Sequence, residues 1–294
     1  MSHRRSPSFL VAALAALSGS VASAGSVTLT SVADNTLYQS DLGTISNGAG
    51  TAMFAGTSAS LASNIRRAVL RFDVAAGVPA GATITSASLV LNENGSNFDE
   101  YVCKVYRVLA SWGEGASVAT GGQGGGTLAQ ADDATWLRRF YPASNWTSAG
   151  GDFSTTESAS LAIGAGAAFT WTSAQLASDV QDMLNNPATN FGWLIQGDET
   201  IPKTAKRFAT REDATPELRP ALLIEFSTGC LGDLNGDTFV DDSDFVLFAN
   251  AYNILDCADP AMPAGCPADL NADLFVDDSD FVLFASAYND LICP

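Results

Sequence analysis

The residues best suited to bind a metal lie in an acidic segment that the chain contains twice. The stretch DLNGDTFVDDSDFVLFANAYN begins at Asp233, and DLNADLFVDDSDFVLFASAYN begins 36 residues later at Asp269. Of the 28 positions aligned from Cys230 and from Cys266, 21 are identical. We expect the two copies to fold as a pair, because one such unit cannot bury its apolar face alone.

Oxygen-bearing residues recur in each copy at the offsets of a calcium-binding loop. An EF-hand loop supplies ligands from positions one, three, five, seven, nine and twelve, and position seven uses its backbone carbonyl. The predicted ligands are Asp233, Asn235, Asp237, Phe239, Asp241 and Asp244 in the first copy, and Asp269, Asn271, Asp273, Phe275, Asp277 and Asp280 in the second. A solvated acidic loop is the alternative, but it leaves crowded like charges without a counter-ion. We therefore expect two calcium ions, since magnesium prefers tighter octahedral sites that retain water.

The sixth loop position is normally glycine, because the chain turns sharply there. Thr238 and Leu274 occupy it in the two copies. A residue other than glycine with positive φ costs about 1 kcal/mol. We expect weaker calcium affinity or altered loop geometry, above all in the loop that contains Leu274.

An apolar helix is predicted after each loop, and none is predicted before it. Its face consists of Phe245, Phe248, Ala249 and Tyr252 in the first copy, and of Phe281, Phe284, Ala285 and Tyr288 in the second. The duplicated pattern D-x-N-x-D-x-x-x-D-x-x-D with its helix, over residues 230–294, resembles the dockerin module of secreted polysaccharide-degrading assemblies. That resemblance implies a cohesin-like protein partner, in contact with the pairs just before the twelfth ligand: Asp242, Ser243, Asp278 and Ser279. The alternative is that these four residues only start their helices.

Four of the five cysteines lie in this segment and follow the same repeat. Four cysteines allow three pairings. If the two helices are antiparallel, Cys230–Cys293 and Cys257–Cys266 are favoured, because pairing within one repeat would have to reach back about 20 Å along a helix. Metal ligation by the thiols is the alternative, although no C-x-x-C pair supports it. Cys103 is left over and is predicted to be a buried thiol.

Charge divides the chain into two parts. Residues 230–294 contain 13 Asp and no Glu, Lys or Arg, whereas residues 25–229 contain 19 acidic and 12 basic residues. We therefore expect two domains, at residues 25–228 and 229–294. The formal net charge of −18 argues against nucleic acid and anionic lipid as partners.

Residues 1–24 are predicted to be a secretory signal peptide. The basic start MSHRR precedes the apolar run FLVAALAALSGSVA and three small residues at 22–24. A membrane anchor is the alternative, but the apolar run is short for a bilayer, so we expect no membrane insertion. The protein is thus expected to be secreted, in the extracellular space or at the cell surface, where its cysteines can oxidise.

Short alternating apolar runs between turn residues predict a mainly β fold for residues 25–228. RAVLRFDV, TITSASLVLN and YVCKVYRVL are three of them, at a spacing typical of a β-sandwich. One short helix is predicted in TSAQLASDVQDMLNN, capped by Thr172 or Ser173.

Five segments in this region resemble, in order, the DNRLRE or disaggregatase-related domain. They are RRAVLRFDVAAGVPAGATITSASLVL, VLASWGEG, DDATW, FTWTSAQLASDVQDMLNNPATNFGWLIQGDE and RFATREDATPELRPALLIEF, and they cover most of residues 27–227. That resemblance implies a jelly-roll β-sandwich that acts as a carbohydrate-binding module. Acidic polysaccharides such as alginate are among the ligands of the family.

Sugars are held by aromatic faces and polar side chains, with Arg or Lys for carboxylates. The predicted carbohydrate-binding residues are Trp112, Trp136, Tyr141, Trp146, Lys203, Lys206 and Arg207, with Arg138, Arg139 and Arg211 as further candidates. The tryptophans lie in a loop-rich region where exposure is expected, and the basic stretch PKTAKR (202–207) favours an anionic ligand. Core packing of the tryptophans and a solvated basic loop are the alternatives.

The only histidine is His3, within the predicted signal peptide. Histidine-dependent nucleophilic catalysis and His-ligated zinc are therefore not expected. A carboxylate-pair glycosidase would need two aligned acids, but the acids of residues 25–229 are scattered through predicted loops. We expect a non-catalytic protein that binds polysaccharide and docks to a partner through a calcium-loaded C-terminal segment, residues 229–294, called the tail below. The alternatives are a structural or adhesive surface protein without sugar binding, and a polysaccharide lyase or hydrolase.

Overall fold

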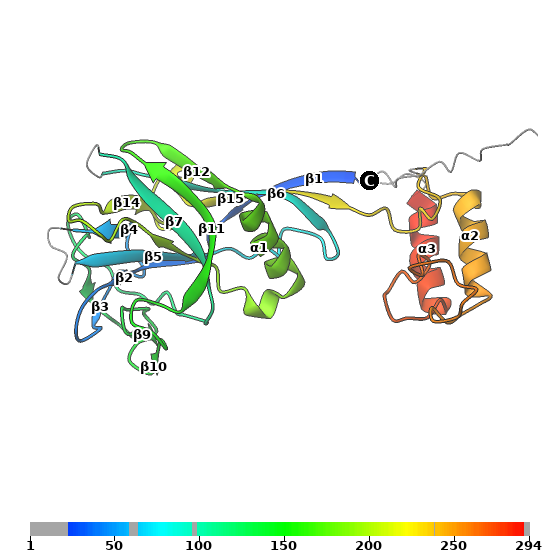
Figure 1. Cartoon of the computed structure of the whole chain (residues 1–294), viewed down its shortest axis with the longest axis horizontal. Coiled ribbons are helices and arrows are strands. Elements are labelled where there is room, and N and C mark those ends of the chain that lie inside the picture. The colour runs from blue at the N-terminus through cyan, green and yellow to red at the C-terminus, as the bar shows by residue number, and fades with distance from the viewer. Residues whose placement is uncertain (1–22, 59–63, 96–98, 238, 291–294) are drawn as a thin grey trace, which may run out of the picture. The chain divides into compact units, whose positions relative to one another are not determined.

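The computed structural model describes residues 23–58, 64–95, 99–237 and 239–290 (Figure 1). This part of the chain divides into two compact units, with the boundary between Thr228 and Gly229. The predicted signal peptide lies almost entirely outside the described residues, and so do Thr238 and Cys293. No helix among the described residues is long and apolar enough to cross a membrane.

The first unit is built mainly from β-strands. They are β1 (Ser23–Thr30), β2 (Ala33–Tyr38), β3 (Ile45–Ser46), β4 (Ala52–Thr57), β5 (Ile65–Arg71), β6 (Thr83–Asn92), β7 (Tyr101–Val108), β8 (Thr127–Leu128), β9 (Arg138–Phe140), β10 (Ser144–Asn145), β11 (Phe153–Ile163), β12 (Ala168–Thr172), β13 (Trp193–Gln196), β14 (Lys206–Ala209) and β15 (Ala221–Thr228). Four strands form one sheet in the order β1-β15-β6-β12. Seven form another in the order β11-β7-β13-β5-β4-β14, with β2 paired to β5. The mainly β fold expected from the alternating runs is confirmed.

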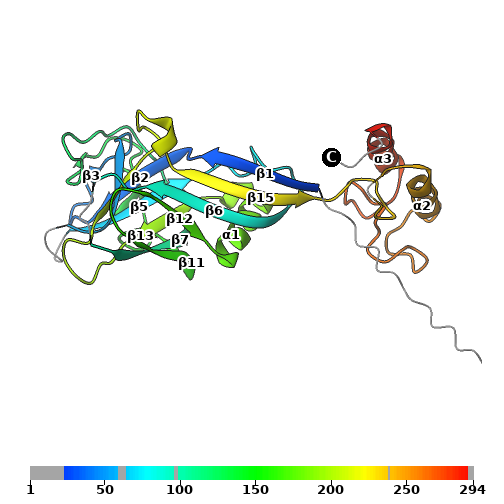
Figure 2. The ribbon, with the colours of Figure 1, turned by 90° about the horizontal axis from the view of Figure 1, so that it is seen from above.

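The main core of this unit lies between the two larger sheets (Figure 2). Leu89 of β6 packs there with Leu70 of β5 and Val105 of β7, and all three side chains are fully buried. The rings of Trp171 and Phe208 meet edge to face across the core, with centroids 6.1 Å apart. Buried residues alternate with more exposed ones along β6, as the period of two in a strand requires. Each strand thereby presents one apolar side to the core.

The predicted helix forms as α1 (Ala174–Asn185). Ser173 caps it, because its hydroxyl accepts a hydrogen bond of 2.9 Å from the backbone N–H of Leu176. Leu176, Val180 and Met183 are fully buried and join the main core. Short 3-10 turns follow at Pro187–Thr189 and Pro216–Leu218.

A second core covers the other side of the seven-stranded sheet. Val69 and Leu194 point to this side and pack with Trp112, Trp136 and Trp146, which come from the long connection between β7 and β11. This connection, at residues 109–152, therefore folds over the outer sheet face instead of extending into solvent. Burial of three indole rings supplies a large apolar contribution to its docking.

The second unit contains α2 (Asp242–Tyr252) and α3 (Asp278–Asp290), each directly after one acidic loop. Phe248 and Phe284, which occupy equivalent positions of the repeat, stack with centroids 4.9 Å apart. The flanking pairs match as well, since Phe245–Phe284 and Phe248–Phe281 are each 6.1 Å apart. Each copy therefore covers the aromatic face of the other.

Candidate functional site

The first acidic loop brings three carboxylates together at the start of α2. Oxygen atoms of Asp233, Asp237 and Asp244 lie within 4.8 Å of one another. Asp237 is exposed, whereas Asp244 is fully buried. Asn235 adjoins this group, because its amide donates a hydrogen bond of 3.0 Å to Asp237 Oδ2.

The second loop repeats the arrangement at the start of α3. Oxygen atoms of Asp269, Asp273 and Asp280 lie within 4.8 Å of one another. As in the first loop, the fifth-position residue Asp273 is exposed and the twelfth-position residue Asp280 is buried. Asn271 donates a hydrogen bond of 2.9 Å to Asp273 Oδ2. Six of the twelve predicted ligand positions are thus the members of two matching carboxylate triads.

The twelfth-position aspartate holds each loop against its helix. Asp244 Oδ1 accepts hydrogen bonds from the backbone N–H of Leu234 and of Asn235, at 2.7 and 2.9 Å, and Oδ2 accepts one from Asp241 at 3.0 Å. In the second copy, Asp280 accepts the equivalent three bonds, at 2.7, 3.0 and 2.9 Å. Each carboxylate oxygen has two lone pairs, so Oδ1 is fully used by its two bonds, whereas Oδ2 keeps one lone pair for a cation.

The ninth-position aspartates are placed as helix caps. Asp241 accepts a hydrogen bond of 2.7 Å from the N–H of Ser243, and Asp277 accepts one of 2.8 Å from Ser279. Neither belongs to a carboxylate triad of the described residues. In EF-hand loops the ninth-position residue often contacts the ion through a water molecule. The position of Asp241 and Asp277 as helix caps is compatible with such an indirect contact.

The turn of the second loop has the backbone conformation that glycine would prefer. Leu274 has a φ of 76°, as anticipated for its sixth position. Ala272 also has a positive φ, 62°, where the first loop has Gly236 at 80°. The second loop therefore holds two non-glycine residues in the left-handed region, each at a cost of about 1 kcal/mol.

The two triads suit a hard cation. Calcium binds oxygen ligands at about 2.3–2.6 Å, so two oxygens on one ion are separated by at most about 5 Å. The 4.8 Å limit within each triad meets this condition. No Lys or Arg occurs in residues 230–294 to neutralise the carboxylates. Carboxylate, amide and carbonyl oxygens in one loop form a donor set that suits a hard cation better than a soft metal.

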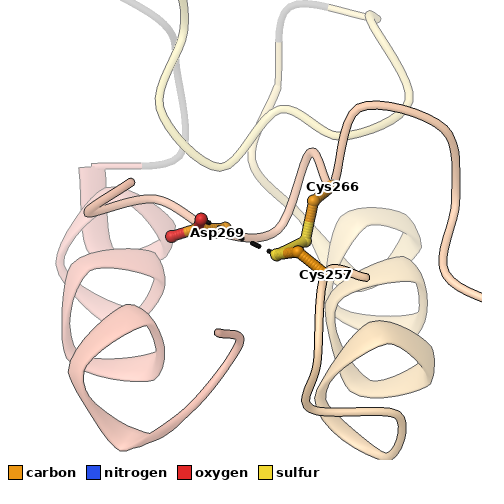
Figure 3. Close-up of side chains that lie close together, drawn as sticks. All are labelled: Cys257, Cys266 and Asp269. Carbon is orange, nitrogen blue, oxygen red and sulfur yellow. Dashed lines mark hydrogen bonds between the residues drawn. A yellow bond between two sulfur atoms is a disulfide. The ribbon is translucent and has the colours of Figure 1, made fainter. Parts of the chain in front are cut away.

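A disulfide lies beside the second loop. Cys257 and Cys266 are joined with an S–S distance of 2.01 Å, the pairing expected from sequence. Figure 3 shows the bond next to Asp269, whose Oδ2 is 3.7 Å from Cys257 Sγ. A disulfide sulfur has no hydrogen to donate, so this approach is a van der Waals contact. Neither sulfur is available as a thiolate ligand. The predicted Cys230–Cys293 bond depends on a residue outside the described ranges, and Cys103 is a buried free thiol, as predicted.

The predicted partner-binding residues lie at the starts of the two helices. Asp242 and Asp278 are exposed, and each accepts a hydrogen bond from a tyrosine at the far end of the other helix, Tyr288 and Tyr252 respectively. These bonds show that the helices run antiparallel. Ser243 and Ser279 are exposed too. A groove of about 370 Å³ adjoins Asp242 and is lined by Phe245, Phe281 and Tyr288.

The expected exposure of the three tryptophans is wrong. Trp112, Trp136 and Trp146 are only 6%, 8% and 5% exposed. The indole N–H of Trp112 donates to Phe191 O at 2.9 Å, and that of Trp146 donates to Thr135 O at 2.9 Å. Their loop covers the sheet, so the indole faces are in the second core and are not accessible to a sugar.

The basic stretch at 202–207 also does not form one patch. Lys206 belongs to β14 and is fully buried, with its ammonium donating to Asp99 O at 2.6 Å and to Gly164 O at 3.0 Å. Arg207 is half-buried and donates to Asn94 O at 3.0 Å. Lys203 is exposed, and Tyr141 is half-buried in the β9–β10 region. Alternation along the strand separates the charges that are adjacent in sequence.

A groove on the first unit was not found from the sequence. It has a volume of about 500 Å³ and lies on the outer side of β7 and β13, where Tyr101, Lys104 and Tyr106 line it with Gln196 and Glu199. Alternation in YVCKVYRV predicts the placement of Lys104 and Tyr106, because they alternate with Cys103 and Val105, which are buried.

No protein-family model matches the sequence, and no curated protein is significantly similar to it.

Proposed function

We propose that residues 229–294 form a dockerin-like module that binds two calcium ions and attaches the protein to a cohesin-like partner. The observation that carries the proposal is the pair of matching carboxylate triads, one at the start of each helix. In this proposal the carboxylates, Asn235 or Asn271, and the carbonyl of Phe239 or Phe275 hold the ion. The bound ion would offset two of the negative charges of each loop and fix the start of its helix.

Calcium titration of the whole protein by calorimetry tests this module. Asp237→Asn and Asp273→Asn each remove one carboxylate from an exposed loop position while retaining the size of the side chain. We expect two ions bound at these loops in the unmodified protein, one in each single variant and none in the double variant. Asp259→Asn is the matched control, because Asp259 is an exposed acid outside both loops. Equal calcium binding by the unmodified protein and the double variant would refute the two sites.

The proposed partner surface is the face shared by α2 and α3. Val246 and Val282, at equivalent positions of the repeat, are 58% and 67% exposed, and Phe245 and Phe281 border the nearby groove. Because the two helices present the same residues, a partner could bind in either of two orientations. This symmetry supports docking more than it supports a purely stabilising role for the tail.

For the first unit we propose a jelly-roll of the DNRLRE type that binds polysaccharide on its outer sheet face. The groove of Tyr101, Lys104 and Tyr106 supports this, since aromatic and polar side chains together are the usual lining of sugar sites. Glu100, Asp198 and Glu199 also line the groove, so its charge favours a neutral polysaccharide over the anionic one expected from the basic stretch.

The protein as a whole is proposed to be secreted and non-catalytic. A structural or adhesive surface protein and a polysaccharide lyase or hydrolase are the competing functions. Incubation with a panel of polysaccharides, followed by assays for reducing ends and for unsaturated products, distinguishes them. Product formation would overturn the non-catalytic proposal.

A further inference from the structure

A second group of acids lies in the first unit. Oxygen atoms of Asp34, Glu114 and Glu212 lie within 4.8 Å of one another. They come from β2, from the connection after β7 and from the turn after β14. Asp34 is 80 residues from Glu114 and 177 from Arg211, the residue before Glu212. The fold alone brings them together.

Arg211 neutralises this group only in part. Its guanidinium donates to both oxygens of Glu114, with Nε at 2.6 Å from Oε1, and Nε lies 3.0 Å from Glu212 Oε1. Three carboxylates and one guanidinium leave a formal charge of −2 when all are ionised. A divalent cation would cancel that charge.

Two oxygens in the group have no hydrogen-bond partner. Asp34 Oδ1 and Glu212 Oε2 are the only carboxylate oxygens among the buried, unpaired side-chain atoms of the described residues. Asp34 is fully buried, and its Oδ2 already accepts the N–H of Arg211 at 2.9 Å. Leaving a buried polar atom unpaired costs free energy. Two such oxygens in one acidic cluster therefore favour the binding of a cation.

As an ionised carboxylate oxygen, Asp34 Oδ1 needs a donor or a cation, and the described residues supply no donor to it. Burial, together with Glu212 and Glu114, raises the pKa of Asp34 well above its usual range, so the charged carboxylate is unfavourable without a counter-ion. The separations are suited to calcium, whose ligand oxygens are up to about 5 Å apart.

We propose that Asp34, Glu114 and Glu212 form a cation site in the β-rich unit that takes a hard divalent cation of the calcium class. Glu114 and Glu212 are partly exposed, with 15% and 20% of their side chains accessible, so water can complete the coordination from the solvent side. The ion would join β2 to the connection that covers the outer sheet face and to the turn after β14. It would act as a structural staple and is separate from the calcium loops of the tail.

Terbium, a luminescent probe for calcium sites, tests this in the whole protein. All five tryptophans lie between residues 112 and 193 and none lies in the tail, so selective tryptophan excitation reports an ion in the first unit. Trp112 is two residues from Glu114. We expect sensitised terbium emission that calcium displaces, and loss of this emission in Asp34→Asn and in Glu212→Gln. Glu212→Gln is included because it changes a less buried side chain, and circular dichroism checks that each variant is folded.

The matched control is Asp41→Asn, an exposed acid of the same unit, which should retain the emission. The double variant Asp237→Asn/Asp273→Asn should retain it too, so failure of the tail sites and failure of this site are distinguishable. Absent emission in the unmodified protein, or unchanged emission and calcium displacement in folded Glu212→Gln, would overturn the proposal.

Discussion

At the residue scale, the two acidic loops differ at the position of Ala272, where the first loop has Gly236. Their carboxylates, asparagines and backbone hydrogen bonds match closely. In the second loop Ala272 and Leu274 both lie in the left-handed region, and the Leu274 side chain is 68% exposed. Since that side chain packs against little, its replacement should change conformational energy more than packing.

Leu274→Gly is therefore expected to tighten calcium binding at the second loop. Relief of about 1 kcal/mol corresponds to about fivefold in affinity, if the loop is less ordered before the ion binds. Calorimetry in the Asp237→Asn background isolates this loop. Leu255→Gly is the matched control, because Leu255 has a φ of 71° but lies outside both loops. Weaker binding by Leu274→Gly would contradict the strain argument.

At the scale of elements, each helix of the tail depends on the other. The apolar faces meet through the stacked Phe248 and Phe284, and each helix end is tied to the other through a tyrosine–aspartate hydrogen bond. What remains exposed is a second, symmetric set of apolar residues, which includes Val246 and Val282. An exposed apolar set on such a small unit is consistent with the proposed docking.

The symmetry of this surface predicts how variants should behave. Val246→Lys or Val282→Lys alone should leave one binding orientation and lower the affinity about twofold, by simple statistics of two equivalent modes. The double variant should lose binding to a panel of purified cohesin domains in calcium. Ala261→Lys, an exposed loop position, serves as the control. Undiminished binding by the double variant, or no binding by the unmodified protein, would refute docking through this face.

At the scale of the whole molecule, the outer sheet face of the first unit is divided between two uses. The connection at residues 109–152 covers one part with its tryptophans, while the uncovered part near β7 keeps Lys104 and Tyr106 on the surface. Tyr106 also packs beside Phe153, with centroids 5.4 Å apart, which holds its ring in place. The proposed sugar site is therefore the part of the sheet that this connection leaves open.

Tyr106→Ala is expected to weaken retention of the protein in polysaccharide-containing affinity gels. Loss of one aromatic contact of about 1 kcal/mol would lower the affinity about fivefold. Tyr141→Ala, which changes a half-buried tyrosine away from the groove, should have no effect. If retention is lost only in Tyr141→Ala, the sugar site lies in the β9–β10 region and not on the sheet face.

Features that depend on short distances along the chain could be predicted from the sequence alone. The two loops are defined within a dozen residues each, so their converging carboxylates and their helices followed from spacing. Alternation likewise predicted the β fold, and the repeat with antiparallel helices led to the Cys257–Cys266 disulfide. The dockerin and calcium assignments remain proposals that these features support.

The accessibility of the polar and aromatic residues could not be predicted, because it depends on how the chain packs in three dimensions. Composition placed Trp112 and Lys206 among the sugar-binding candidates, yet both are buried, because the connection at 109–152 covers a sheet and β14 points Lys206 inward. The cluster of Asp34, Glu114 and Glu212 likewise had no local signature. Contacts between residues so far apart in sequence depend on how the sheets and loops pack, and a pattern of adjacent residues carries no record of that packing.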